Sequence, residues 1–366
     1  MLTPARSRRW FLASLPAAAC FAAETRPKGR LFPSAVYRYN DPATEFPILR
    51  LTDPAHTSFL PAFFTRAISR HNFLVYSSDF TGHLDAFRMD FKNGQSRQIT
   101  EDADLHPALV TLTPDERELC YFDRNRLMAT NLTNLKSRQI YAIPDGSERG
   151  GGLAIAEDGQ YAAIVERSPS RYRLMLVHTQ NGSTTTLAES DEEIREPVPR
   201  PRRASVLYRR GGALWLVNYD ARQNYRLKLA GGEIRRGLWS PDGRSVLYLN
   251  YPEDPHQLHS IREFVPDTNE DRLITPTSQY VSFAPNADAS VFVGASGSKA
   301  SPYVLLVVRA VKRELTLAEH RASDASIVNP VFTPNSQRIF FVSDRDGKPA
   351  VYTMAVDKLV EETDSP

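Results

Sequence analysis

Arginines at two places in the chain are the side chains best suited to chemistry. Arginine is always charged, and its planar guanidinium pairs with carboxylate or phosphate groups. We call these residues the arginine cluster. One stretch contains Arg195, Arg200, Arg202 and Arg203, and the other contains Arg235 and Arg236. Together these residues predict an anion-binding surface. For any single arginine, the alternative is a solvated charge in a loop.

Histidine offers the other candidate chemistry, as a general base or a metal ligand. His56 and His106 stand alone, and a lone histidine is more often a hydrogen-bonded structural residue. His256 and His259 are close in sequence, but the prolines just before them favour a loop over a helix that would present both rings. A metal site needs three or four converging ligands, and a chain with two cysteines has no cysteine-based zinc site. We therefore expect no bound metal.

Several function classes are disfavoured by what the sequence lacks. It contains no Gly-x-Ser-x-Gly elbow, phosphate-binding loop or zinc-protease helix. The formal net charge is only +2, so no domain-wide basic excess indicates a nucleic-acid partner. The composition, with 41% hydrophobic and 24% charged residues, is typical of a globular protein.

The elements that position these side chains belong to one repeating unit of about 44 residues. Each unit reads as an apolar residue, a Thr/Ser-Pro pair, a tight turn and then further strands. Clear copies begin at Val110, Leu238 and Val331. Weaker copies begin near Phe63, Leu153, Val198 and Val281. Four short strands with their turns fill this length, which predicts the blade of a β-propeller.

The two ends of the chain predict how the ring closes. The first unit lacks an opening strand, and the last unit, 330–356, lacks a closing one. We expect residues 48–51 to pair as the outer strand of the final blade, which removes an exposed sheet edge. The expected fold is one all-β seven-bladed propeller over 46–358, between an N-terminal extension at 24–45 and a tail at 359–366. A β-solenoid or two sandwiches would leave the complementary truncation unexplained.

The propeller interpretation selects the candidate site residues. The first strand of each blade lines a central channel, and the loops that lead into these strands gather at one face. Polar side chains just before the Thr/Ser-Pro turns are therefore candidates for ligand binding. They are Arg149, Glu196, Arg200, Arg236 and Asn329, with His56 and His106 as candidate bases.

The first 23 residues resemble an export signal. Residues 7–12, Ser-Arg-Arg-Trp-Phe-Leu, resemble the twin-arginine motif, and an ordinary secretory signal is the alternative. The apolar run at 10–22 is too short to span a bilayer. We predict a periplasmic or secreted protein with no transmembrane segment. Cys20 is a candidate for lipid attachment.

Three stretches resemble the oligogalacturonate lyases: residues 77–82, 215–218 and 329–352. The resemblance extends from about residue 48 to 356, and its Phe-Thr-Pro and Ser-Asp-Arg-Asp-Gly patterns are shared with the propeller of TolB. It implies a seven-bladed propeller that cleaves pectin-derived uronic-acid oligosaccharides by β-elimination, with a divalent metal, usually manganese.

The same resemblance implies metal-binding histidines that this chain lacks. The lyase pattern has His-x-His-Pro before the last Phe-Thr-Pro, where this sequence has Ile327 and Asn329. Asp324 stands near the position of a glutamine, and Arg236 takes the place of a histidine before the fifth-blade tryptophan. An arginine of the family falls near Ala213. We therefore expect no cofactor, although the family uses manganese.

Two functions stay open, and with them the question whether the chain is an enzyme. One is an oligogalacturonate-lyase-like enzyme with a remade site, in which Arg200 and Arg236 hold carboxylates and His56 or His106 is the base. The other is a non-catalytic, TolB-like periplasmic propeller that binds an anionic sugar, a peptide or a protein.

Overall fold

The structure, a computed structural model, describes residues 28–101 and 104–360. The predicted export signal and Cys20 lie outside the described residues, as do residues 361–366. Apart from a 3-10 turn, η1 (Ala325–Ile327), and a short helix, α1 (Asp357–Val360), the described elements are strands. None of the helices among these residues is long and apolar enough to cross a membrane.

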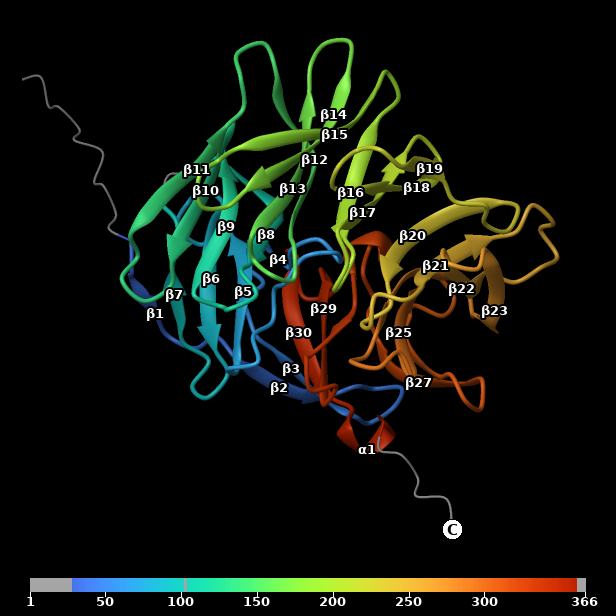
Figure 1. Cartoon of the computed structure of the whole chain (residues 1–366). Coiled ribbons are helices and arrows are strands. Elements are labelled where there is room, and N and C mark those ends of the chain that lie inside the picture. The colour runs from blue at the N-terminus through green and yellow to red at the C-terminus, as the bar shows by residue number, and fades with distance from the viewer. Residues whose placement is uncertain (1–27, 102–103, 361–366) are drawn as a thin grey trace, which may run out of the picture.

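The strands form sheets arranged around a central axis (Figure 1). The first sheet has the order β1-β7-β6-β5-β4 and the last has the order β2-β3-β30-β29-β28. The strands of the first sheet are β1 (Leu31–Phe32), β4 (Ser58–Phe59), β5 (Phe73–Ser78), β6 (Asp85–Asp90) and β7 (Ser96–Gln98). The strands of the last sheet are β2 (Tyr37–Asn40), β3 (Pro47–Arg50), β28 (Val331–Phe332), β29 (Arg338–Ser343) and β30 (Ala350–Ala355).

Three further sheets are simple four-stranded antiparallel meanders. The first contains β8 (Leu105–Leu112), β9 (Glu118–Asp123), β10 (Arg126–Asn131) and β11 (Ser137–Ala142). The second contains β20 (Glu233–Trp239), β21 (Val246–Tyr251), β22 (Ser260–Val265) and β23 (Glu270–Pro276). The third contains β24 (Tyr280–Pro285), β25 (Val291–Ser296), β26 (Tyr303–Val308) and β27 (Arg313–Glu319).

The remaining sheet has eight strands and consists of two such meanders. One half is β12 (Glu148–Ile155), β13 (Tyr161–Arg167), β14 (Tyr172–His178) and β15 (Thr184–Ser190). The other is β16 (Ile194–Pro199), β17 (Ser205–Arg210), β18 (Ala213–Asn218) and β19 (Asn224–Arg226). A parallel bridge from Gly151 to Arg195 joins their innermost strands, β12 and β16. The all-β propeller is thus confirmed, and the number of blades depends on how this sheet is divided.

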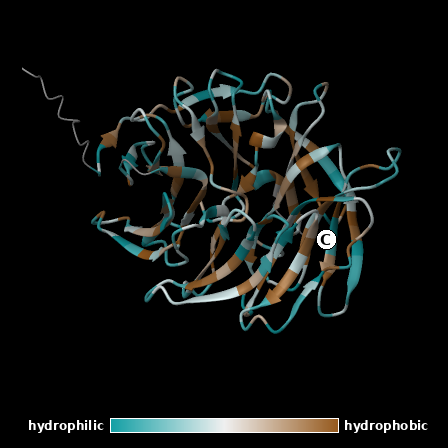
Figure 2. Ribbon diagram, turned by 90° about the horizontal axis from the view of Figure 1, so that it is seen from above, coloured by the Kyte–Doolittle hydropathy of each residue, from teal (hydrophilic) through white to brown (hydrophobic). Residues whose placement is uncertain are grey.

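The apolar core is distributed between the sheets rather than gathered in one centre. Seven clusters of buried side chains occur among the described residues, and each joins two sheets or half-sheets that follow one another around the ring. The cluster around Phe87, for example, joins the first sheet to Phe340 and Val342 of the last. Apolar segments accordingly lie on the strands, and hydrophilic ones predominate in the outer loops (Figure 2).

The N-terminal strand closes the ring as predicted. β3 pairs antiparallel with β30, with Ile48 opposite Met354 and Arg50 opposite Tyr352. Ile48 is fully buried in the cluster between the last two sheets. The residues assigned to an N-terminal extension also take part, because β2 pairs outside β3 and β1 pairs outside β7. β3 is therefore an inner strand of a five-stranded sheet, not its outer edge.

The repeated Thr/Ser-Pro motif forms the turn at which an innermost strand ends. In the turn after β20, Ser240 Oγ donates to Asp242 Oδ1 over 2.6 Å, and Gly243 adopts a φ of 70°. Thr113 and Asp115 repeat the hydroxyl–carboxylate bond at 2.7 Å. A short polar side chain that bonds within the turn favours this tight reversal. The motif thus fixes where each innermost strand leaves the channel.

Candidate functional site

The two ends of the central channel are built differently. We call the end where the innermost strands begin the front mouth, and the end where they finish in Thr/Ser-Pro turns the rear mouth. Near the front mouth the innermost strands β8, β12, β16, β20 and β24 each contain a break in register of the β-bulge type. A bulge changes the direction of the side chains at that point, so the polar residues there are no longer in regular register with the neighbouring strand.

Arg236 and Asn329 meet at the front mouth. Arg236 Nη1 donates to Asn329 Oδ1 over 2.9 Å and to the Phe283 carbonyl over 3.2 Å. Asn329 Nδ2 donates to the Pro61 carbonyl over 3.2 Å. The Arg236 guanidinium also lies over the Phe63 ring, 4.1 Å from its centroid. The contact group therefore joins three sheets and the segment that follows β4.

Local backbone conformation places both side chains. The register of β20 shifts between Ile234 and Gly237, so Arg236 belongs to the bulge. Asn329 precedes β28 with a φ of 40°, in the left-handed region that Asn adopts more readily than most residues. Both positions were candidates from the sequence, and the structure brings them together.

A buried ion pair supports Arg236 from behind. Arg209 is only 2% exposed, and its Nε donates to Glu196 Oε2 over 2.9 Å. Its other nitrogens donate to the carbonyls of Ile234, at 2.8 Å, and Arg235. Arg209 therefore holds the backbone immediately before Arg236. Glu196 adopts a φ of 53°, a costly conformation for a residue with a long side chain.

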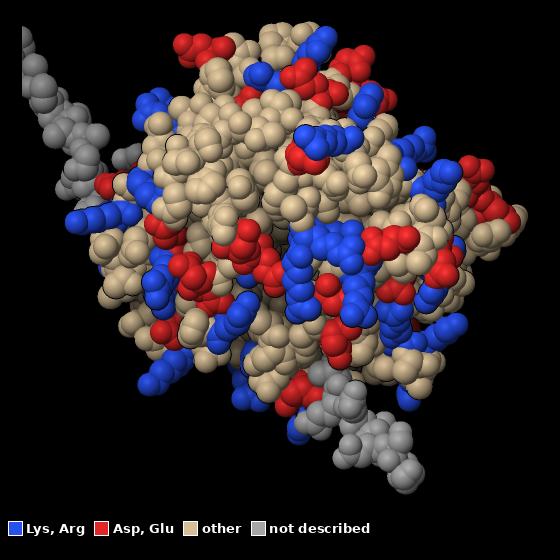
Figure 3. Space-filling view, viewed as in Figure 1, with Lys and Arg blue, Asp and Glu red and all other residues tan. Residues whose placement is uncertain are grey.

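Arg236 itself is a cation without a carboxylate partner. Burial lowers the pKa of Arg236 to about 10, and the nearby Glu196 charge opposes that shift. The guanidinium is therefore still protonated at neutral pH. On the face seen in Figure 3, acidic and basic side chains lie near one another in many places. Arg236 forms no ion pair with any residue in 28–101 or 104–360, although many of the other arginines do. A charge held in this way favours an anionic ligand.

His106 and Arg149 lie together at the start of the neighbouring strands β8 and β12. Arg149 Nη1 donates to the Asp104 carbonyl over 2.6 Å, and Nη2 lies 3.3 Å from Asp104 Oδ2. Partial burial and the Arg149 charge lower the pKa of the His106 ring, which is still exposed. His106 is thus neutral at pH 7 and able to accept a proton. Arg149 is committed to holding the start of β8.

The structure does not bring His56 to this group. His56 Nδ1 lies 3.6 Å from Asp79 Oδ1, and its ring packs against Phe80 with centroids 4.6 Å apart. Phe80 in turn contacts Phe32 of β1, the outermost strand of that sheet, with a centroid separation of 4.7 Å. His56 therefore faces the outer part of the first sheet.

Arg200 lies at the rear of the ring. Its Nε donates to the Gly243 carbonyl over 2.7 Å, and its guanidinium lies 4.7 Å from the Trp239 ring centroid. Arg200 is 6% exposed and joins two neighbouring sheets through these contacts. Arg203 is also on the rear side, where it pairs with Asp267 at 2.9 Å. The arginine cluster of the sequence is thus divided between the two ends.

Two other arginines of that cluster have local acidic partners. Arg235 Nε lies 2.9 Å from Glu233 Oε1, and Arg195 Nε lies 3.9 Å from Glu193 Oε2. Pairs this exposed contribute little energy and leave little free positive charge. Arg236 is therefore the arginine at the front mouth best placed to hold an anion.

Sequence reasoning missed Arg209, and it included Phe63 only as part of the stretch 56–64 without singling it out. Phe63 falls in the first unit, which lacks the Thr/Ser-Pro turn that marks the other channel strands. Arg209 lies in the apolar strand β17, where a buried arginine is unexpected and is therefore itself a signal.

Comparison with known proteins finds relatives that are similar over most of the chain. A curated oligogalacturonide lyase of Pectobacterium atrosepticum is 26% identical over an alignment 385 positions long, which covers 90% of this chain and 98% of the lyase. An oligogalacturonate lyase of Dickeya dadantii is 24% identical, again over 90% of this chain and 98% of its own. The chain is a homologue of the oligogalacturonate lyases.

Solved structures of oligogalacturonate lyases have the same fold as this chain. An oligogalacturonate lyase in complex with manganese superposes with a TM-score of 0.85 at 24% identity, over 90% of this chain and 98% of its own. The Vibrio parahaemolyticus lyase gives 0.85 at 22% identity, over 92% and 100%. TolB of Xanthomonas campestris is a more distant relative, 33% identical over 93 residues, which are 24% of this chain and 21% of TolB. No protein-family profile matches the chain.

The side chains at the front mouth do not fit a manganese ion. Asn329 uses both ends of its amide, on Arg236 and on Pro61. Both Asp324 oxygens accept bonds from Ser326, and Ile327 packs against the apolar cluster of the first and last sheets. No group of three or more His, Cys, Asp and Glu in 28–101 and 104–360 could hold a metal. A divalent cation here would also meet the Arg236 charge.

Proposed function

We propose that the front mouth binds the carboxylate of a uronic-acid oligosaccharide, with Arg236 as its anchoring cation. The observation that carries this proposal is the unpaired Arg236 guanidinium, held in place by Asn329, Phe283 and the Phe63 ring. The relatives named as oligogalacturonate lyases supply the ligand class, because their names denote proteins that act on anionic oligosaccharides.

The geometry of Arg236 suits a carboxylate. Nη1 makes both of its hydrogen bonds to protein oxygens, at 2.9 and 3.2 Å. The Nε–Nη2 edge has no acceptor among the described residues, and such an edge binds a carboxylate through two parallel hydrogen bonds. The Arg209–Glu196 pair holds the preceding backbone, so the guanidinium is pre-organised for its ligand.

Catalysis by β-elimination is the second candidate, and His106 is the observation that favours it. Its pKa is lowered, so a neutral imidazole is available at the same end of the channel. The Ala62 N–H bond to the Ala108 carbonyl, at 3.2 Å, ties the start of β8 to the segment that carries Phe63. In this reaction the base takes the proton α to the carboxylate, a C4–C5 double bond forms, and the C4–O bond breaks with its electron pair leaving on oxygen.

We further propose that the ring has seven blades and that the protein is exported. The two halves of the eight-stranded sheet then count as separate blades, which is supported by the seven apolar clusters between successive units. Export through the twin-arginine route to the periplasm is supported by the sequence at 7–12. A periplasmic protein or peptide partner, as for TolB-like propellers, is the alternative ligand.

Calorimetric titration with trigalacturonate tests the binding proposal. Arg236→Gln should weaken binding at least tenfold, whereas the matched control Arg235→Gln removes an exposed neighbouring charge and should leave the affinity unchanged. Equal affinities for Arg236→Gln and the unsubstituted protein would refute Arg236 as the anchor. Ultraviolet absorbance of the unsaturated product separates the two candidates. A rise that His106→Gln abolishes indicates a lyase, and binding without any rise indicates a non-catalytic binder.

A further inference from the structure

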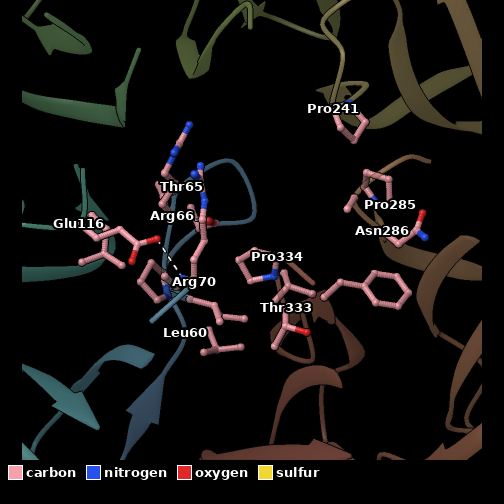
Figure 4. A pocket seen from close by; sticks show the side chains of 18 residues that line it. Leu60, Thr65, Arg66, Arg70, Glu116, Pro241, Pro285, Asn286, Thr333 and Pro334 are labelled. Atoms are coloured by element: carbon pink, nitrogen blue, oxygen red, sulfur yellow. Dashed lines mark hydrogen bonds between the residues drawn. The ribbon is translucent and has the colours of Figure 1, made fainter. Parts of the chain in front are cut away.

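A pocket opens at the rear mouth, between the segment that follows β4 and the Thr/Ser-Pro turns that end the innermost strands (Figure 4). Its volume is about 320 Å³. One wall is apolar and is formed by Leu60, Leu112, Pro241, Pro285, Val331 and Pro334. The front-mouth proposal uses none of these side chains.

Two arginines enter this pocket from the segment after β4. Arg66 and Arg70 both line it, and neither guanidinium has a hydrogen bond or ion pair among the described residues. Figure 4 shows both side chains on the same side of the pocket, across from Pro285 and Asn286. Burial and the Arg70 charge both lower the pKa of Arg66, so the two cations are close enough to repel each other. Such a pair is stabilised by an anion between them.

The one carboxylate that lines the pocket is already engaged. Glu116 Oε1 accepts the Arg70 backbone N–H over 2.9 Å. Its Oε2 accepts the Ser69 hydroxyl and lies 2.7 Å from His71 Nδ1. Glu116 therefore fixes the turn that carries Arg70 instead of pairing with the guanidinium groups. Two arginines and one glutamate give the lining one net positive charge, and the carboxylate of Glu157, which does not line the pocket, also acts on the Arg66 charge.

The backbone that carries Arg66 is fixed as well. The Arg66 carbonyl accepts the Leu112 N–H over 2.8 Å, and the Arg66 N–H donates to Thr111 Oγ1 over 3.1 Å. At the next residue, the Ala67 carbonyl accepts the Val75 N–H over 2.8 Å. The backbone at Arg66 is thus held from two sides, although this segment between β4 and β5 is not itself a strand, and little order must be gained there on binding.

We propose that the rear-mouth pocket binds a small monocarboxylate with an apolar body. The carboxylate lies between Arg66 and Arg70, and the body packs on the apolar wall around Leu112 and Pro334. A single negative charge matches the net charge of the lining, which disfavours a phosphate dianion. The volume is at the lower end of the range for ligand pockets, which selects a small molecule.

Ligand-observed NMR on the full chain tests this proposal with benzoate as the probe. Benzyl alcohol carries the same ring without the charge, and inorganic phosphate carries charge without the body. We expect benzoate to bind more tightly than either. Arg66→Gln and Arg70→Gln should each raise its Kd tenfold or more. Arg244→Gln, which removes an 84% exposed charge on the same face, is the matched control and should leave the Kd unchanged.

Three results would overturn the proposal. They are no benzoate binding to the unsubstituted protein, equal Kd values for the unsubstituted protein and both pocket variants, and tighter binding of phosphate than of benzoate. Thermal melting checks that the variants fold, and Arg70 is exposed enough that its loss should leave the fold intact. Arg236→Gln should retain benzoate binding, so a failure here is distinguishable from a failure at the front mouth.

Discussion

Replacing Glu196 with Gln tests whether the buried ion pair at the front mouth supports the ligand site. The change removes a charge and keeps a similar shape and one oxygen acceptor. Arg209, which is only 2% exposed, then loses its charged partner and keeps only its hydrogen bonds to the carbonyls of Ile234 and Arg235. The predicted consequences are lower stability and a loosened backbone before Arg236.

The structure sets the expected size of this effect. Removing one partner of a fully buried ion pair costs about 3–5 kcal/mol. Here the Glu196 side chain is 23% exposed, and Arg209 keeps its two carbonyl bonds. Water and these bonds recover part of the loss, so we expect about 2 kcal/mol of destabilisation. We also expect the Kd for trigalacturonate to rise, since Arg236 is less well positioned.

Denaturant unfolding followed by circular dichroism measures the first effect and calorimetric titration the second. Glu193→Gln is the matched control, because its carboxylate is 55% exposed and lies 3.9 Å from Arg195, and it should change stability by less than about 0.5 kcal/mol. If Glu196→Gln unfolds at the same denaturant concentration as this control and binds trigalacturonate with unchanged affinity, the Arg209–Glu196 pair does not hold Arg236 in position.

Three other outcomes follow from the fold and its ionisable groups. Ile48→Ala should destabilise the ring by about 2–4 kcal/mol in a denaturant melt, because Ile48 is fully buried, whereas Leu31→Ala at a 64% exposed position should have little effect. Burial raises the pKa of Glu116, but its bonds with the Arg70 N–H, Ser69 and His71 outweigh this and lower it. The stabilisation from Glu116 should be present above the pKa of an unfolded glutamate and lost as the pH falls through the folded pKa. Glu116→Gln should therefore cost stability near pH 7 and much less in acid; an equal cost at both pH values would contradict this. Addition of EDTA should leave the melting temperature unchanged, and a drop of several degrees would reveal a metal site.

The sequence is informative about the fold because the same unit recurs. The Thr/Ser-Pro turns mark the end of each innermost strand, and the complementary truncations at the chain ends predict that β3 pairs with β30. Each unit repeats the same alternation of apolar residues, so local and long-range signals agree. The strands at 31–40 were not anticipated, because they have no place in the repeat.

The candidate site was only partly predictable, and strand length explains why. Arg195 and Arg200 are five residues apart in sequence, but β16 runs along the channel at about 3.3 Å per residue. The two arginines therefore lie near opposite ends of the ring. Arg236 and Asn329 were predictable because each lies near the start of an innermost strand that ends in a well-marked Thr/Ser-Pro turn. Arg66 and Arg70 fall in the first unit, where no such turn supplies a reference point.

The pairing of β3 with β30 makes the last blade depend on both termini. A nascent chain exposes the edge of β3 until its partner hairpin, β29 and β30, has left the ribosome. The ring therefore cannot close before β30 has been synthesised, and a chain that stops before β30 leaves an open ring with two unpaired edges. A truncated product of this kind would be prone to self-association through these edges, so the hairpin of β29 and β30 protects the whole ring as well as completing one blade.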